Sequence, residues 1–188
     1  MNLIAFQNRL RTQNLYTKVN QTQLRGMFEI IAHWEANETL TDKRWLAYML
    51  ATVYHETAKT FEPIEEFGKG LRRPYGEKIK QSRKRYTVPD KLYYGRGFVQ
   101  LTWYENYDKF GKLLKIDLLN EPEQALKLDV SIDILFIGMI EGLFTGVGLD
   151  RYFNDKREDW TNARKIINGL DKAELIGIYG QRFYECLK

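Results

Sequence analysis

The stretch LTDKRWLAYMLATVYHET, residues 40–57, has the pattern of a helix that is buried on nearly all sides. Thr41 is a favourable N-cap residue, and Leu40 and Trp45 occupy the two positions of a hydrophobic staple. Apolar residues then follow all round the helix: Trp45, Leu46, Ala47, Met49, Leu50, Ala51 and Val53. This distribution is typical of a central helix, which we expect from about Asp42 to Thr57.

Helical patterns recur on both sides of this stretch. Apolar residues at helical spacing predict further helices at about 22–36, 104–114, 123–127, 131–144 (with Ser131 as N-cap) and 160–168. A capping-box pattern at residues 171–174 opens a last helix that runs to Leu187. The run YYGRGFVQLTW, residues 93–103, indicates a turn that enters a short extended segment. The sequence therefore predicts a mainly α fold with at most a small β element near residues 93–103.

Composition favours one folded domain over residues 1–188. The chain has 188 residues, is 44% hydrophobic and contains 26 aromatic residues, so it can bury a sizeable core. Its single cysteine, Cys186, excludes an intramolecular disulfide and a cysteine-rich zinc module. Neither a signal peptide at Met1–Arg9 nor a membrane span in the most apolar stretch, Ile132–Leu149, is expected.

Positive charge is concentrated in one segment, which lies in a predicted loop at about residues 60–92. Residues 69–91 contain nine basic and two acidic residues, a net charge of +7, whereas the whole chain carries +4. Such a cluster favours a polyanionic partner, which leaves nucleic acid, an anionic membrane or an anionic cell-wall polymer open. The alternative is an ordinary solvated loop.

Several kinds of catalytic site are missing from the sequence. There is no Gly-x-Ser-x-Gly motif, and Lys59 stands where a zinc protease helix beginning at His55 would need its second histidine. We therefore expect no metal and no cofactor.

Glu56 is the carboxylate that its helix places most unusually. At about 100° per residue it lies about 20° from Trp45 and Met49 around the helix, at the end of an apolar stripe. A carboxyl group against such a surface is expected to have a raised pKa, as a general acid needs. The alternative is a helix-terminal glutamate that faces solvent or pairs with a basic residue.

A glycosidase needs a second carboxylate, and an inverting enzyme places it about 6.5 to 9.5 Å from the acid. Glu62, Glu65 and Glu66 follow the helix closely enough to be candidates, because the chain must turn at Pro63.

Three motifs carry a resemblance to a known family. They are His55-Glu56-Thr57, the YYGRGFVQLTW run and Ile166-Ile167-Asn168-Gly169. In this order they resemble glycoside hydrolase family 19, which comprises chitinases and related bacteriophage endolysins with a lysozyme-like α fold. The resemblance covers roughly residues 25 to 187.

The resemblance implies roles for individual residues. It makes Glu56 the general acid and matches Gln100 and Thr102 to a polar pair that holds water and sugar. It further implies substrate-binding positions at His55, Tyr94, Asn106 and Asn168, and an arginine supporting the carboxylates at Arg182. The second catalytic glutamate of plant members would fall at Glu77, whereas that of the smaller phage-like members matches Glu65; we choose Glu65 and keep Glu66 and Glu77 as alternatives.

These features lead to an expected function. The short chain, the basic segment and the lack of a signal peptide favour an endolysin that hydrolyses β-1,4 bonds of peptidoglycan with inversion. It would be a monomer without membrane insertion, present in the host cytoplasm and released to the cell wall by a holin. The alternatives are a chitinase acting on N-acetylglucosamine polymers and a non-catalytic protein that binds nucleic acid or cell wall through residues 69–91, although we expect no nucleic-acid partner.

Overall fold

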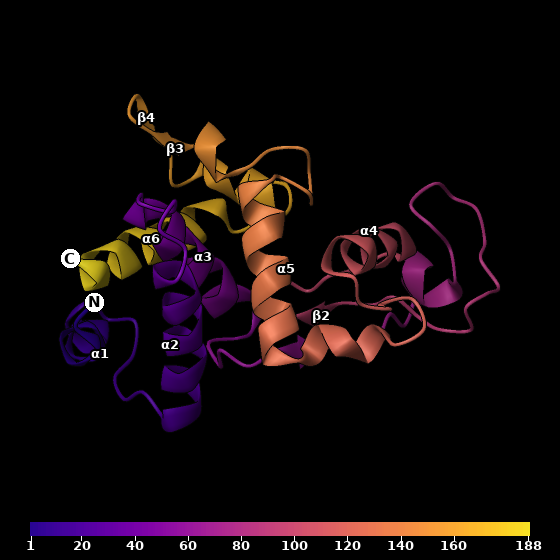
Figure 1. The fold of residues 1–188 in the computed structure, drawn as a ribbon, viewed down its shortest axis with the longest axis horizontal. Helices are drawn as coiled ribbons and strands as arrows, with labels where there is room; N and C mark the ends of the chain where they lie inside the picture. The colour runs from indigo at the N-terminus through magenta and orange to yellow at the C-terminus, as the bar shows by residue number, and fades with distance from the viewer. The chain divides into compact units, whose positions relative to one another are not determined.

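The computed structural model describes residues 1–188 as two compact units. Unit 1 comprises residues 1–61 and 135–188, and unit 2 comprises residues 62–134. Six α-helices and only short strands make up the chain, which confirms the predicted mainly α fold (Figure 1). That residues 1–188 act as one catalytic domain stays a prediction.

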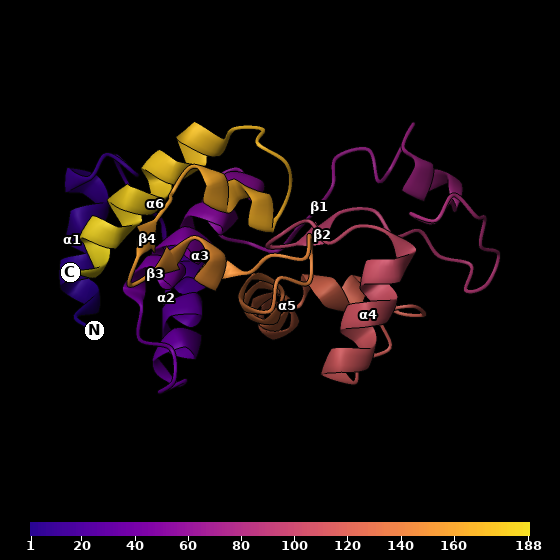
Figure 2. The same ribbon diagram turned by 90° about the horizontal axis from the view of Figure 1, so that it is seen from above.

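Unit 1 is built around the helix that the sequence places at its centre. Helix α3 (Lys43–Glu56) is buried at every residue from Leu46 to Tyr54, and it packs most extensively against α6 (Ala173–Leu187). Helix α1 (Leu3–Thr12) packs on α6, and α2 (Gln21–Glu35) packs on α3 (Figures 1 and 2). Burial all round α3 explains why its apolar residues show no single face.

The N-cap of α3 differs from the prediction by one residue. Asp42, rather than Thr41, is the N-cap, and its carboxylate accepts a hydrogen bond from the Arg44 amide at 3.0 Å. The Arg44 guanidinium also pairs with Asp42, so the aspartate satisfies an orphan helix amide and a cation together. Thr41 lacks the charge that makes this double role favourable.

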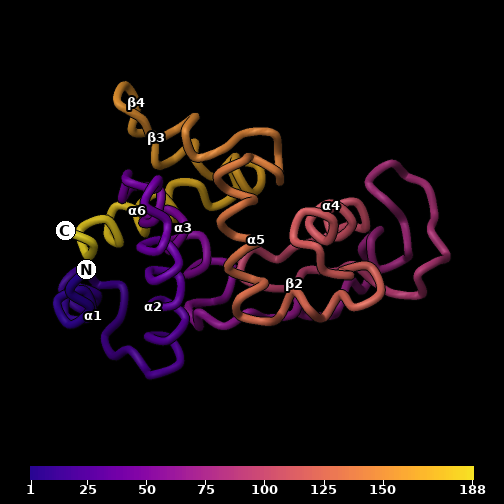
Figure 3. Tube along the Cα trace, in the orientation of Figure 1, coloured from indigo at the N-terminus to yellow at the C-terminus, as the bar shows by residue number.

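Both chain ends lie in unit 1 close to each other (Figure 3). Arg9 of α1 donates to the Cys186 carbonyl at 3.4 Å, and Lys43 donates to the Leu187 carbonyl at 3.0 Å. These bonds link the C-terminal turn of α6 to the last turn of α1 and to the start of α3.

The remaining elements of unit 1 are short. They are the 3-10 helices η3 (Leu149–Arg151) and η4 (Asn162–Ile166) and the paired strands β3 (Phe153–Asn154) and β4 (Arg157–Glu158). The helix predicted at 160–168 is therefore only a short 3-10 segment. Its importance lies in the buried Arg164 that it carries.

Unit 2 contains the predicted β element. Strand β1 (Ile64–Glu65) pairs antiparallel with β2 (Arg96–Gly97), so that Glu65 lies opposite Arg96. The unit also contains η1 (Pro74–Glu77), α4 (Tyr104–Leu114) and η2 (Pro122–Leu126). Residues 66–92 form a long excursion in which η1 is the one helical element (Figure 1).

The boundary between the units falls inside α5 (Leu128–Ile140). This helix begins three residues before the predicted N-cap, Ser131. The Ser131 hydroxyl instead accepts a hydrogen bond from the Phe98 amide at 2.7 Å, so it provides the acceptor for the first backbone amide after β2. The serine that the local sequence favours as a helix cap therefore serves as the acceptor for the buried Phe98 amide, which lies outside the helix.

None of the helices combines the length and the apolar character that crossing a membrane requires.

Candidate functional site

Glu56 is the last residue of α3, and its carboxylate is held by an arginine from a distant part of unit 1. The Arg164 guanidinium donates to Glu56 Oε1 at 2.7 Å. The Arg164 side chain is only 5% exposed and that of Glu56 only 16%, so little water screens the pair. Arg164 is fixed in turn by a hydrogen bond from its Nε to the Asp171 carbonyl at 3.2 Å.

His55 precedes Glu56 on the same helical turn and is half-buried. Burial lowers its pKa, an effect that the Glu56 carboxylate opposes and Arg164 reinforces. The imidazole is therefore neutral at pH 7 and can both donate and accept a hydrogen bond.

Asn168 lies four residues beyond Arg164 and is exposed. Its backbone amide donates to the Arg164 carbonyl at 3.1 Å, and its side-chain oxygen accepts from the Gly169 amide at 2.8 Å. The arginine that pairs with Glu56 thus lies two residues before the Ile166-Ile167-Asn168-Gly169 motif, and its carbonyl is hydrogen-bonded to the asparagine of that motif.

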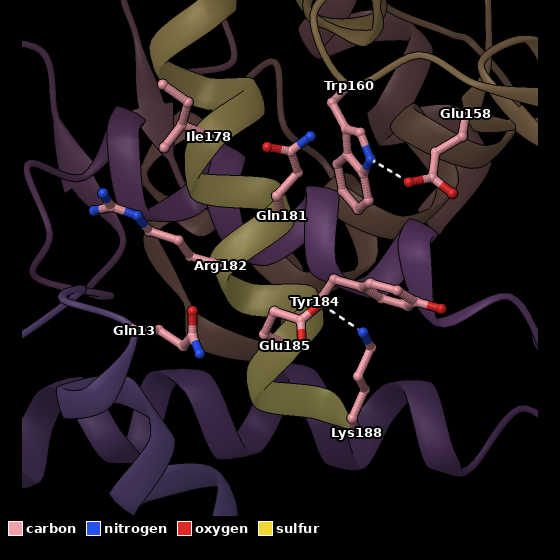
Figure 4. A pocket seen from close by; sticks show the side chains of 9 residues that line it. All are labelled: Gln13, Glu158, Trp160, Ile178, Gln181, Arg182, Tyr184, Glu185 and Lys188. Atoms are coloured by element: carbon pink, nitrogen blue, oxygen red, sulfur yellow. Dashed lines mark hydrogen bonds and ion pairs between the residues drawn. The ribbon is translucent and has the colours of Figure 1, made fainter.

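Arg182 does not occupy the position expected of it. It lies on α6, and its guanidinium donates to the Asn14 carbonyl at 3.4 Å. It lines a groove of about 410 Å³ together with Gln13 and Trp160, and Figure 4 shows its side chain extending from α6 away from Trp160. The arginine paired with Glu56 is Arg164, which no local sequence pattern indicates, because 108 residues separate the partners and only the fold brings them together.

Glu65 in unit 2 is surrounded by donors. The Tyr94 hydroxyl donates to Oε1 at 2.6 Å, Lys69 Nζ lies 2.9 Å from Oε2, and Arg96 Nε lies 3.6 Å from Oε1. The hydrogen bond from Tyr94 and then that from Lys69 lower the pKa of Glu65, against the opposing effect of partial burial. Glu65 is therefore ionised at neutral pH, as the base that activates a water must be.

Glu66 and Glu77 have other surroundings. Glu66 accepts a hydrogen bond from the Tyr75 hydroxyl on Oε1 at 2.8 Å and one from the Gly95 amide on Oε2 at 3.1 Å. It therefore links the loop that contains Tyr75 to the YYGRGFVQLTW segment. Glu77 ends η1 and is exposed. Of the three candidates, Glu65 has the surroundings of an ionised base with a partly exposed carboxylate.

The polar residues of the YYGRGFVQLTW run lie in unit 2 with Glu65. The Gln100 amide nitrogen donates to the Ile64 carbonyl at 3.0 Å, immediately before Glu65 in β1. A Cβ on Gly95 would approach the Gln100 side-chain oxygen to 2.7 Å, so a larger residue at 95 would displace the Gln100 side chain from its present place.

Thr102 and Asn106 form a second polar pair in unit 2. The Asn106 side chain, in the first turn of α4, donates to the Thr102 carbonyl at 2.9 Å. Both side chains are half-exposed and remain close to the Gln100 segment in sequence. The structure thus gathers Glu65, Tyr94, Gln100, Thr102 and Asn106 in unit 2, and His55, Glu56 and Asn168 in unit 1.

Comparison with known proteins gives a family and relatives. The family model described as chitinase class I, glycoside hydrolase family 19, matches residues 5–136. Basic endochitinase CHB4 of Brassica napus is 40% identical over 81 residues, which cover 43% of this chain and 29% of that protein. Endochitinase of Carica papaya is 34% identical over 88 residues, covering 43% and 36%. The chain thus spans about a third of the length of the curated relatives it matches.

Solved structures share the fold. Chitinase C from Streptomyces griseus HUT6037 superposes with a TM-score of 0.68 at 20% identity, covering 100% of this chain and 78% of that one. The class IV chitinase from Zea mays gives a TM-score of 0.56 at 17% identity, covering 90% and 81%.

Proposed function

Because the chain belongs to glycoside hydrolase family 19, we propose that it is a chitinase-type glycosidase that cleaves β-1,4 bonds next to N-acetylglucosamine with inversion. The observation that carries the proposal is the set of contacts that holds two carboxylates at the positions of the family's motifs, Glu56 being paired with a basic residue, the alternative that its helix-terminal position left open. Glu56 ends a buried helix against a buried arginine, and Glu65 is an ionised carboxylate held by a tyrosine and a lysine.

The proposed reaction assigns one proton transfer to each carboxylate. Glu56 would give its proton to the glycosidic oxygen as the bond from that oxygen to the anomeric carbon breaks. Glu65 would take a proton from a water whose oxygen bonds to the same carbon from the opposite face of the sugar. The product formed first then has the α configuration. Gln100, Thr102, Asn106 and Asn168 would bind the sugar and the water.

Replacement of each carboxylate tests these roles. Glu56→Gln and Glu65→Gln keep shape but cannot exchange the proton, so we expect each to lower kcat by about 10² to 10⁴-fold. Glu77→Gln is the matched control and should keep most activity, because Glu77 is exposed at the end of η1. Release of reducing ends from chitin oligosaccharides measures the rate; a Glu56→Gln enzyme with near-normal activity would contradict the assigned acid.

Chitin is the substrate that the relatives favour, since the curated relatives from Brassica napus and Carica papaya are named endochitinases. Peptidoglycan is a second candidate. It is favoured by the basic segment 69–91, because peptidoglycan peptides carry carboxylates that a net charge of +7 would attract. In that case the chain would act as an endolysin that a holin releases to the cell wall.

A side-by-side assay separates the two substrates. Chitin oligosaccharide release and loss of turbidity of purified peptidoglycan are measured with the same enzyme preparation, and Glu56→Gln is the inactive control in both. Faster cleavage of chitin supports the first candidate, and lysis of peptidoglycan without chitin cleavage supports the second. NMR of the first product, in which an α anomer is expected, tests inversion independently.

A further inference from the structure

Arg96 is a buried cation whose contacts lock it in one orientation. Its side chain is 6% exposed, and Nη1 donates to the Leu92 carbonyl and to the Tyr107 hydroxyl, each at 3.0 Å. The Tyr107 hydroxyl in turn donates a hydrogen bond to the Tyr94 carbonyl at 2.8 Å. A guanidinium held by two acceptors cannot rotate freely, so its planar face and its Nε keep a fixed orientation.

One of those neighbours is the Tyr94 ring. The Arg96 guanidinium carbon lies 3.7 Å from the ring centroid, a stacked cation–π contact made away from solvent. The guanidinium therefore holds the Tyr94 ring, and the hydrogen bond from the Tyr107 hydroxyl to the Tyr94 carbonyl holds its backbone. Its hydroxyl then reaches Glu65 Oε1 at 2.6 Å.

Arg96 also faces Glu65 directly. Its Nε has no hydrogen-bond partner and lies 3.6 Å from Glu65 Oε1, a distance at which charge attraction persists without a hydrogen bond. The third group facing the carboxylate is Lys69, 63% exposed, which pairs with Oε2. Buried groups therefore contact Oε1, whereas Oε2 contacts one largely exposed lysine.

We propose that Tyr94 is a positioning residue for Glu65, held in place by Arg96, and not a residue that binds the sugar. This inference rests on the proposed role of Glu65 as the base. With Oε1 fixed by Tyr94, Oε2 is the oxygen left to take the proton of the water once Lys69 moves aside.

The neighbouring tyrosine provides a matched control. The Tyr93 hydroxyl is also buried and donates to a backbone carbonyl, that of Leu119, at 2.8 Å, but it does not touch Glu65. Tyr93→Phe and Tyr94→Phe therefore each remove one buried tyrosine hydroxyl, and only Tyr94→Phe removes a hydrogen bond to the Glu65 carboxylate. Circular dichroism shows whether both variants fold.

The test measures the Glu65 carboxyl itself. Loss of the Tyr94 hydroxyl removes a donor that favours the ionised form, so the pKa of Glu65, followed by ¹³C NMR, should rise by about one pH unit in Tyr94→Phe and stay unchanged in Tyr93→Phe. The acidic limb of the kcat profile should move upward by the same amount. We expect kcat to fall by about 10-fold with KM unchanged.

Other outcomes separate the positioning role from the function on which it rests. A Tyr94→Phe enzyme with raised KM, normal kcat and an unshifted Glu65 pKa would show sugar binding and overturn the proposal. If Glu65→Gln remains active, the assignment of the base is wrong, but the NMR titration still decides whether Tyr94 controls the carboxyl. Arg96→Lys keeps the charge without the rigid stack, and it should raise the Glu65 pKa in the same direction as Tyr94→Phe; an unchanged value would contradict the part assigned to Arg96.

Discussion

At the level of single residues, the two carboxylates differ in what holds them. Glu56 is held by one buried arginine, and Glu65 is held by a tyrosine and two cations of which one is solvated. A buried arginine is costly to leave unpaired, so each partner of the Glu56–Arg164 pair depends on the other.

Removing Arg164 tests this dependence. Arg164→Met leaves Glu56 without its partner in a poorly solvated place, so we expect the free energy of unfolding to fall by about 2 to 4 kcal/mol and kcat to fall as well. Arg182→Met is the control, since Arg182 is hydrogen-bonded to the Asn14 carbonyl at 3.4 Å and not to Glu56, and should cost less than about 1 kcal/mol. Urea denaturation measures both; equal losses would contradict the special role of Arg164.

His55 predicts a pH dependence of stability. Burial lowers its pKa in the folded chain, so below about pH 6.5 the unfolded chain takes up the proton first and the free energy of unfolding falls as pH decreases. Replacement by asparagine removes this proton uptake. The variant should therefore lose less stability between pH 7 and pH 5 than the natural chain.

Denaturation curves at several pH values check this expectation. At pH 8, where the imidazole is neutral in both states, the slope of stability against pH should be the same in the two proteins. A His55→Asn chain whose stability falls as steeply as that of the natural chain below pH 6.5 would contradict it.

At the level of elements, the α3–α6 contact depends on small residues of α6. Gly180 lies against the ring of Trp160, and a Cβ there would approach the indole to 2.7 Å and the Tyr48 ring to 3.3 Å. A Cβ on Gly177 would likewise approach the Trp160 backbone to 3.2 Å. Helix α6 therefore approaches its neighbours closely only because these positions lack side chains.

Gly180→Ala should disturb this packing. The added methyl group must displace a large ring in a filled core, so we expect a loss of about 1 to 3 kcal/mol in the free energy of unfolding. Gly169→Ala, where a Cβ meets nothing within 4 Å, is the control and should change stability by less than about 0.5 kcal/mol. Thermal melting compares the two; similar melting temperatures would show that the rings move aside easily.

At the level of the whole molecule, charge is distributed unevenly along the chain. Seven of the nine basic residues in 69–91 are exposed, and the net charge of this segment, +7, exceeds the net charge of the whole chain, +4. Long-range attraction of this kind raises the rate of encounter with an anionic polymer and is screened by salt.

Neutralising part of the segment should weaken binding in a salt-dependent way. The triple variant Arg72→Gln, Arg73→Gln, Lys84→Gln should bind purified peptidoglycan less well at about 0.05 M salt, with a much smaller difference at 1 M, where charges more than about 3 Å apart are screened. Replacing three exposed cations of unit 1, Arg11, Arg25 and Lys165, by glutamine changes the net charge equally and serves as the control. Equal losses at both salt concentrations would contradict an electrostatic role.

The sequence by itself determined four of the six α-helices (α2, α3, α4 and α6) and the approximate place of α5, together with the central position of α3, the small β element and the family; it did not predict α1, and the helices expected at 123–127 and 160–168 are 3-10 segments. These follow from local periodicity and from motifs of contiguous residues, and neither requires knowledge of distant contacts. It also placed Glu56 at the end of the buried helix and chose Glu65 through the resemblance.

Only the tertiary structure decided the partners. It placed Arg164 instead of Arg182 beside Glu56, paired Ser131 with the Phe98 amide instead of using it as a helix cap, and brought Tyr94 and Arg96 to Glu65. An ion pair or a hydrogen bond between residues 29 to 108 positions apart depends on how elements pack, and local sequence patterns contain no information on which of several arginines or serines the packing brings there.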